Sequence, residues 1–389
     1  MKIGLTICEY NPFHNGHLYS LTQIKKQLNP DLTVVIMSGN FTQRGETAIM
    51  HKYARAKHAV LAGADVVFEL PTVFATAPAE IFAKGAVKLL SSLKGEKTLC
   101  FGVENLDKSG LTATATALSS ESEEYKSTVK NLLNEGYSLA KAKHLALEQT
   151  NGECSLFTSS PNNILAVEYT KAIIQNGYQM DILPILRVGA GYKDTANDQE
   201  FSSAMGVRDL VSKGQTEKCK RLLPDYVYQD LPCSIPNCDE NIMFSLICND
   251  KKDLAKIIDC TEGLENRIKC ALKDCFDREE LIKEVSTKRY PATRISRITL
   301  SSLLGISHSL INSCLNSNLY LKVLAVNKDK VDSLSKIAGK TPLLMRKSDC
   351  DKLRANAKKC FAVDVKANDL YNQATKTKTN EYYTQIIKK

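Results

Sequence analysis

Short apolar segments alternate with amphipathic segments over the first hundred residues, and this alternation restricts the fold more than any other feature. Four of the apolar segments, at residues 2–8, 32–37, 65–70 and 98–103, are nearly continuous and rich in β-branched residues. Strands buried on both faces of a sheet have this pattern. Strands separated by helices of roughly 10–15 residues form parallel βαβ units with right-handed crossovers. The sequence therefore predicts an α/β fold with a Rossmann-like, doubly wound parallel sheet.

The rest of the chain is expected to be mainly helical. Residues 105–178 have helical periodicity. Residues 180–186 resemble a late strand of the same sheet, and Pro184 places this strand at an edge. The pattern is helical and basic from about residue 205 to about 318 and is followed by strand-like segments at 320–326 and 343–344. We expect a first α/β domain, built on this sheet, at residues 1–205. Residues 206–389 would then form a mainly helical region with a small α/β part.

The net positive charge is confined to the second half of the chain. Residues 1–200 hold 19 Lys and Arg against 20 Asp and Glu; since the whole chain has 52 and 43, residues 201–389 hold 33 and 23, a net charge of +10. Such asymmetry is typical of a nucleic-acid-binding region, although a solvated lysine-rich surface gives the same count.

The cysteine pattern favours a reduced compartment and gives no metal site. The chain has 13 cysteines, and its first residues lack the pattern of a secretory signal, so we expect a cytoplasmic protein without a disulfide framework. Six cysteines lie between residues 233 and 275, but they contain no CxxC pair and have no histidine nearby. No apolar run approaches the roughly 18 residues of a membrane span, so no membrane association is expected.

A pair of histidines follows the first predicted strand. His14 lies just before the next helix and His17 in its first turn, with Gly16 between them. Free N–H groups at a helix start suit a phosphate, and glycine allows a ligand close to the backbone. Two imidazoles beside a bound phosphate could donate hydrogen bonds to its oxygens and stabilise the negative charge that develops on a leaving pyrophosphate. A helix cap with two surface histidines is the alternative interpretation.

The segment His14-Asn15-Gly16-His17 resembles the HxGH signature of the nucleotidyltransferase superfamily, in which the histidines bind ATP phosphates and stabilise adenylyl transfer. A longer match resembles the tRNA(Met) cytidine acetate ligase family and extends over nearly the whole chain. Its blocks are EYNPFHNGH at 9–17, SGNFTQRGE at 38–46, GAD at 63–65 with ELP at 69–71, SPNNIL at 160–165, RVGAGY at 187–192 and EGLENR at 262–267.

The resemblance implies an ATP site with His14 and His17 as the catalytic residues. The implied ATP-binding residues are Ile7, Cys8, Glu9, Tyr10, Asn11, Pro12, Phe13, His14, Asn15, Gly16, His17, Leu18, Tyr19, Ser20, Gly102, Asn162, Arg187 and Val188. Three of them have ordinary structural alternatives: Gly102 as a turn glycine, Asn162 as a helix cap and Arg187 as a salt-bridge partner.

Two further segments could hold phosphate or acetate. The first is the loop after the second strand, where Ser38, Gly39, Asn40 and Arg44 offer backbone donors and a guanidinium. The second is residues 201–208, which resemble the ISSTxIR element of adenylyltransferases and suggest Ser203 and Arg208 as triphosphate ligands. Met205 stands where that element has threonine.

The resemblance implies an enzyme with ATP and acetate as substrates. Attack of acetate on the α-phosphorus gives acetyl-adenylate and pyrophosphate, and the acetyl group then passes to N4 of the wobble cytidine of elongator tRNA(Met). Aligning the reactants and neutralising charge is sufficient, so no covalent enzyme intermediate is needed. Mg²⁺ is compatible with ATP, but no carboxylate cluster demands it. The alternatives are a cofactor-forming adenylyltransferase and a non-catalytic RNA-binding protein.

A basic segment at residues 288–297 is the predicted contact for tRNA. It contains Lys288, Arg289, Arg294 and Arg297 beside Tyr290. Arg294 and Arg297 are three residues apart and share a helical face. Such a face can bind RNA phosphates while the tyrosine stacks on a base. A solvated helix face is the alternative.

Overall fold

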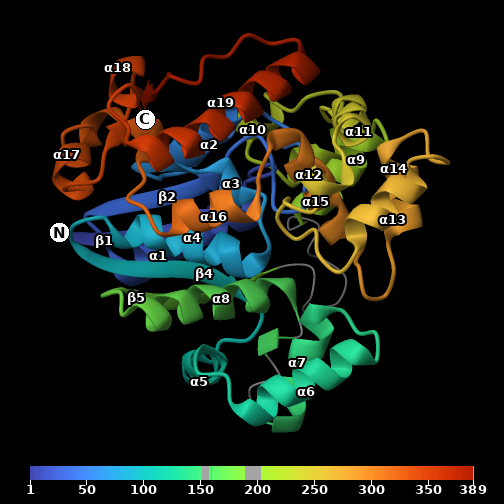
Figure 1. Cartoon of the computed structure of the whole chain (residues 1–389). Coiled ribbons are helices and arrows are strands. Elements are labelled where there is room, and N and C mark those ends of the chain that lie inside the picture. Colours follow the sequence, from blue (N-terminus) through green and yellow to red (C-terminus); the bar gives the residue numbers. More distant parts are fainter. Residues whose placement is uncertain (151–156, 159, 189–202, 389) are drawn as a thin grey trace.

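The residues that the structure describes form one central eight-stranded sheet between helices (Figure 1). The computed structural model describes residues 1–150, 157–158, 160–188 and 203–388. The strand order is β5-β4-β1-β2-β3-β6-β7, with β8 paired to β6. The strands are β1 (Lys2–Cys8), β2 (Leu32–Ser38), β3 (Val66–Leu70), β4 (Glu96–Val103), β5 (Asp181–Leu186), β6 (Leu321–Asn327), β7 (Leu343–Leu344) and β8 (Gln385–Ile387).

The helices fall into three groups along the chain. Those of the first part are α1 (Asn15–Leu28), α2 (Lys52–Leu61), α3 (Thr72–Ala75), α4 (Ala79–Ser91), α5 (Lys108–Ser119), α6 (Glu123–Asn134), α7 (Leu139–Thr150) and α8 (Pro161–Asn176). Those of the middle part are α9 (Ala204–Ser212), α10 (Asp225–Tyr228), α11 (Asp239–Cys248), α12 (Lys251–Leu254), α13 (Leu264–Ala271), α14 (Arg278–Val285), α15 (Ala292–Leu304) and α16 (His308–Leu315). Those of the last part are α17 (Ser333–Ala338), α18 (Lys347–Cys350) and α19 (Ala355–Thr375).

The first five strands are parallel, as the alternating pattern predicted. β1 lies between β2 and β4, β2 pairs β3, and β4 pairs β5, all in parallel. The predicted edge strand at 180–186 is β5, which lies at one end of the sheet. Because parallel strands end at the same edge, the segments that follow β1, β2, β4 and β5 meet there.

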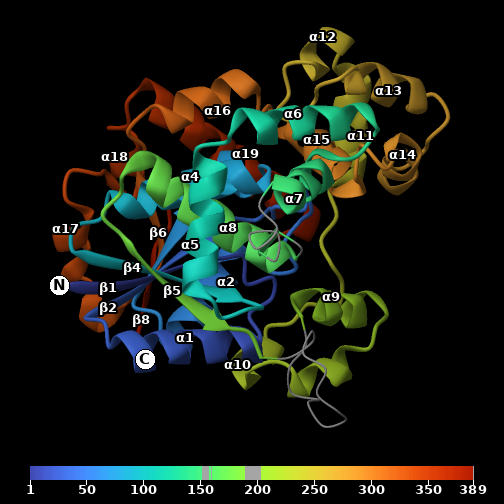
Figure 2. The same cartoon turned by 90° about the horizontal axis from the view of Figure 1, so that it is seen from below.

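The sheet has a core on each face, because alternate side chains of a strand point in opposite directions. In β2, Val34 and Ile36 belong to one core, while Val35 and Met37 belong to the other. Helices α1 and α2 pack on the second core, and α4, α8, α16 and α19 pack on the first. Figure 2 shows α1 on one side of the strands and α16 and α19 on the opposite side.

The late strands extend this sheet rather than forming a separate one. β6 pairs antiparallel with β3, with Val326 opposite Val66, and β7 and β8 pair parallel with β6. The parallel sheet predicted for the first half is thus extended by an antiparallel pairing at β6. A strand that returns from the distant helical region can pair at the free edge of β3 in either direction. The sheet thus draws on both sides of the boundary predicted at residue 205.

Helices α11 to α15 gather beyond one end of the sheet, at the right of Figure 1. They contact the loop after β2: the Arg278 guanidinium donates to the Gly45 carbonyl at 2.6 Å and to the Ser296 carbonyl at 2.9 Å. A Cβ on Gly45 would lie 2.6 Å from the backbone of Ser296, so only glycine allows α15 this close. The helical region is thereby fixed at the carboxyl edge of the strands. Within the described residues, no helix is long and apolar enough to cross a membrane.

Candidate active site

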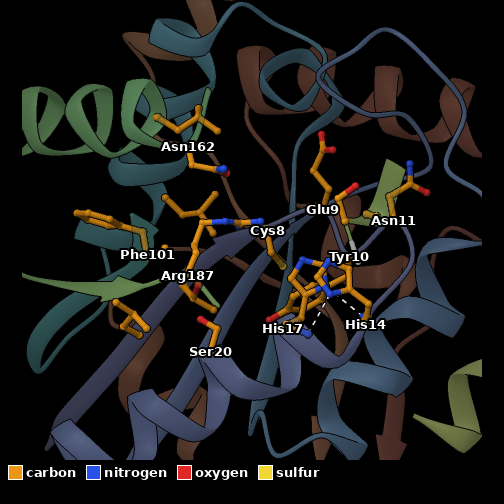
Figure 3. A pocket seen from close by; sticks show the side chains of 18 of the residues that line it. Cys8, Glu9, Tyr10, Asn11, His14, His17, Ser20, Phe101, Asn162 and Arg187 are labelled. Atoms are coloured by element: carbon orange, nitrogen blue, oxygen red, sulfur yellow. Dashed lines mark hydrogen bonds between the residues drawn. The ribbon is translucent and has the colours of Figure 1, made fainter. Parts of the chain in front are cut away.

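A cavity of 360 Å³ opens at the carboxyl edge of the sheet, where the strand ends converge (Figure 3). It contains most of the residues implied by the resemblance. Those that line it are Ile7, Cys8, Glu9, Tyr10, Asn11, His14, Gly16, His17, Tyr19, Ser20, Gly102, Asn162, Arg187, Val188, Ser203 and Arg208. Pro12, Phe13, Asn15 and Leu18 do not line it: Phe13 is buried against Tyr10, and the Asn15 side chain donates to the Arg221 carbonyl.

His14 and His17 form a reciprocal cap at the start of α1. Nδ1 of His14 accepts from the N–H of Gly16 at 3.0 Å, and Nδ1 of His17 accepts from the N–H of His14 at 3.2 Å. The two rings are stacked, with centroids 3.7 Å apart. The histidines thus cap the helix and also form a wall of the cavity, and His14 is buried rather than a surface residue. Their role in phosphate binding stays a prediction.

This cap fixes the protonation of both imidazoles. Because each Nδ1 accepts a backbone hydrogen bond, a neutral ring carries its proton on Nε2. Burial, with a smaller contribution from Arg187, lowers the pKa of His14 to about 4. Burial, followed by the charges of His14 and Arg187, also lowers the pKa of His17 well below its ordinary value. Two neutral Nε2–H donors are therefore available to an anionic ligand.

Gly102, Asn162 and Arg187 come together on the β4 and β5 side of the cavity. A Cβ on Gly102 would lie 3.0 Å from Cγ of Arg187, so glycine provides room there. Asn162 does not cap α8; its side-chain amide donates to Oε1 of Glu104 at 3.0 Å. Arg187 has no ion-pair partner among the residues that the structure describes, which leaves its guanidinium for a ligand.

The element that resembles ISSTxIR faces the same cavity at the start of α9. The Ser203 hydroxyl caps α9 by accepting from the N–H of Gly206 at 3.1 Å, and Arg208 donates to the Asn11 carbonyl at 2.8 Å. Met205 is 54% exposed and does not line the cavity. Phe201 and Ser202 lie outside the described residues, as do positions 189–192 of the RVGAGY block.

The loop after β2 does not meet the cavity through the residues predicted from the sequence. Ser38, Gly39 and Asn40 are buried and Arg44 is exposed, and none of the four lines the cavity. Asn40 instead accepts from the N–H of Lys52 at 2.8 Å, which ties the loop to α2. The side chain that does line the cavity is Gln43.

Arg55 was missed by the sequence reasoning, although it holds the site together. It is fully buried on α2, and its guanidinium donates to the carbonyls of Met50, Glu9, Ser38 and Gly39. It thereby connects the loop after β1 to the loop after β2. A single arginine in a helical pattern gives no signal of such a role, because the four acceptors are backbone atoms.

Three of the four predicted tRNA-binding residues have partners within the chain. Arg289 pairs with Glu262 at 3.0 Å, and Arg297 pairs with Asp259 at 3.0 Å. Arg294 pairs with the same Asp259 at 3.3 Å. Their side chains are 36%, 16% and 14% exposed for Arg289, Arg297 and Arg294 respectively. The arginines therefore fix α15 and the residues just before it to the segment before α13, and their charge is largely offset.

Lys288 is the exposed cation of the predicted segment, and its ammonium lies 6.0 Å from the ring centroid of Tyr137. The tRNA interface therefore stays a prediction, now centred on Lys288 and the helices around it.

The described cysteines are free, and no group of three metal-ligating side chains occurs among the described residues.

Comparison with known proteins identifies the family of the chain. Residues 1–385 match the family model described as HIGH Nucleotidyl Transferase. The chain is 38% identical over 381 residues to the tRNA(Met) cytidine acetate ligase of Thermoanaerobacter sp. (strain X514), covering 95% of this chain and 94% of the relative. The chain belongs to the tRNA(Met) cytidine acetate ligase family. This confirms the resemblance carried by residues 9–17 and 38–46.

Other relatives agree. The chain is 35% identical to the ligase of the same name from Clostridium botulinum (strain Kyoto / Type A2), with 96% of this chain and 94% of that relative covered. Its structure is similar to Thermotoga maritima TmcAL bound with alpha-thio ATP, with a TM-score of 0.90, 29% identity and coverage of 99% and 100%. The apo form of the same Thermotoga protein gives a TM-score of 0.91. The predicted nucleotidyltransferase-type α/β fold is confirmed.

Proposed function

We propose that this protein is an ATP-dependent ligase that activates acetate as acetyl-adenylate and transfers the acetyl group to N4 of the wobble cytidine of elongator tRNA(Met). The observation that carries the proposal is the stacked His14–His17 pair at the start of α1, which faces a cavity large enough for a nucleotide. The names of the relatives supply the acceptor: they are tRNA(Met) cytidine acetate ligases.

In the first step the acetate carboxylate attacks the α-phosphorus of ATP and pyrophosphate leaves. The Nε2–H groups of His14 and His17 donate to the phosphates as negative charge moves to the leaving group. Arg187 binds from the β5 side and Arg208 from α9, so that the phosphates lie between two guanidinium groups. Ser203 holds the first turn of α9 in place beside Arg208.

In the second step the exocyclic amine of the cytidine attacks the acetyl carbonyl, and AMP leaves. We assign activation to residues 1–205 and tRNA binding to residues 206–389. The net charge of +10 over residues 201–389 suits an RNA backbone. Arg278 on α14 and the Ser296 backbone on α15 contact the Gly45 loop, so tRNA bound along these helices would reach the carboxyl edge of the sheet. Mg²⁺ would enter with the ATP phosphates.

Acetate-dependent exchange of pyrophosphate into ATP tests the proposal. We expect exchange with acetate and the purified protein alone, and acetylated tRNA once an elongator tRNA(Met) transcript is added. Absence of both, with tRNA present and the protein folded, would refute the ligase. Exchange driven by a nucleoside monophosphate derivative instead would indicate a cofactor-forming adenylyltransferase. Binding of tRNA without any exchange would indicate a non-catalytic RNA-binding protein.

A further inference from the structure

The cavity has two sides, defined by the strands that flank β1. Gly102, Asn162 and Arg187 come from the ends of β4 and β5 and from the start of α8. Glu9 follows β1 and Gln43 follows β2, on the opposite side. In Figure 3, Asn162 and Arg187 lie to one side of Cys8, and Glu9 and Asn11 lie to the other. The β2 side is therefore free for a second reactant when nucleotide occupies the β4 and β5 side.

Glu9 presents a carboxylate on this second side. Its Oε1 accepts from the backbone N–H of Gln43 at 2.7 Å, and it has no ion-pair partner in the described part of the chain. The carboxylate points away from His14 and His17 (Figure 3). The backbone of residues 9–17 can therefore contact the nucleotide while the Glu9 side chain faces another part of the cavity. One oxygen is held by the loop, and the other is left for a ligand.

Gln43, whose backbone N–H donates to that carboxylate, also carries an unpaired side-chain donor. Its Nε2 is buried and has no hydrogen-bond partner among the described residues, and its side chain lines the cavity. A buried amide left unpaired is costly, and such groups in native structures usually serve a ligand. Because the Gln43 backbone is bound to Glu9, the acceptor and the donor are held as a pair.

An acceptor next to a donor matches one edge of cytosine. The cytosine N4 amine donates, and the neighbouring N3 accepts; a carboxylate that accepts from N4 is a recognised protein contact to this base. Uracil has the opposite pattern, with an accepting O4 and a donating N3–H. The loop that carries Gln43 packs on α15, beside the basic segment, so a base held out from bound tRNA would enter from that direction.

We propose that Glu9 and Gln43 form the binding site for the acceptor cytosine, and that Glu9 is the general base of acetyl transfer. This inference rests on the proposed function. The N4 nitrogen forms a bond to the acetyl carbon, the bond from that carbon to the phosphate oxygen breaks, and AMP leaves with the electron pair. One N4 proton passes to the free oxygen of Glu9, while Gln43 donates to N3.

The surroundings of Glu9 suit this role. Burial raises the pKa of its carboxyl, against the lowering effect of the Gln43 N–H and of the charges of Arg208, Arg55 and Arg44. A stronger base removes the N4 proton more readily. The exocyclic amine of cytosine is a weak nucleophile because its lone pair is delocalised into the ring, so the second step needs this assistance more than the first.

The test is the Glu9→Gln variant, assayed separately for each step. Glutamine keeps the oxygen that accepts from the Gln43 N–H but cannot take a proton. We expect acetate-dependent pyrophosphate exchange to fall much less than acetyl transfer. Transfer from preformed acetyl-adenylate to a tRNA(Met) transcript, followed in a single turnover by rapid quench, should be slower by about 10²–10⁴-fold. The wild-type transfer rate should rise with pH until Glu9 is ionised, and the variant should lose this rise.

Glu124→Gln, an exposed carboxylate on α6, is the matched control and should transfer at the wild-type rate. Transfer by Glu9→Gln at the wild-type rate, or an equal loss of exchange and transfer, would overturn the inference while leaving the ligase intact. Failure of the wild-type protein itself to exchange would refute the proposed function and this inference with it. Gln43→Leu should raise the tRNA concentration needed for half-maximal transfer without changing exchange; no change there would remove Gln43 from the site.

Discussion

Replacement of Arg55 by methionine should reveal how much one buried guanidinium contributes to the active site. Four backbone carbonyls, those of Met50, Glu9, Ser38 and Gly39, accept from it inside the protein. Each buried acceptor left unpaired costs roughly 1–2 kcal/mol, or about 4–8 kcal/mol together. Relief of the desolvated guanidinium offsets roughly half of this. We therefore expect the free energy of unfolding to fall by about 2–4 kcal/mol.

Urea denaturation measures this change, and Lys57→Met is its control. Lys57 lies on the same helix, is 46% exposed and pairs with Asp230 only at 3.7 Å. Its replacement should change the free energy of unfolding by less than about 1 kcal/mol. A loss below 1 kcal/mol for Arg55→Met as well would refute the reasoning. Because Arg55 also positions the Glu9 backbone, the folded variant should show a lower kcat for acetyl transfer with an almost unchanged KM for ATP.

The remaining predictions concern the histidines and the basic segment. His17→Ala should reduce acetate-dependent exchange by about 10²–10³-fold, the effect of losing one donor to developing charge, while tRNA affinity in a filter-binding assay stays unchanged. The unfolded state binds a proton on His14 near pH 6.5 but the folded state only near pH 4, so His14 should lower the free energy of unfolding by up to about 3 kcal/mol as pH drops through this window. His14→Gln should reduce the pH dependence in urea titrations by this amount, while the dependence due to His17 remains. Lys288→Ala should weaken tRNA binding and reduce the salt slope by about one, and an unchanged slope would place the interface elsewhere. Arg297→Ala leaves Asp259 with one fewer partner, so it should lower the thermal midpoint rather than the salt slope.

The parts of the fold that depend on local pattern could be predicted. The β-branched strands and the histidine motif combine short-range signals with a known order along the chain, so β1 to β5 and the start of α1 follow from them. The place of β6 beside β3 could not be predicted, because pairing between residues 66 and 326 leaves no periodic trace in either segment.

Long-range pairing, which the sequence does not show, decides which of the predicted side chains are free. Arg294 and Arg297 share a helical face, as predicted, but Asp259 pairs with both from more than thirty residues away. In the loop after β2, the sequence identified the right segment but not which side chain faces the cavity. Gln43 is distinguished from its neighbours only by the direction the folded backbone gives it.

The buried ammonium of Lys52 binds two carboxylates, Glu69 at 2.7 Å and Glu381 at 2.6 Å. The backbone N–H of the same lysine donates to Asn40 in the loop after β2. This loop is therefore attached to a residue whose ammonium pairs with Glu381, 329 positions further along the chain. On the ribosome, a nascent chain that has the whole histidine motif would still lack the second carboxylate. The buried charge of Lys52 would then be fully compensated only after residue 381 has left the exit tunnel.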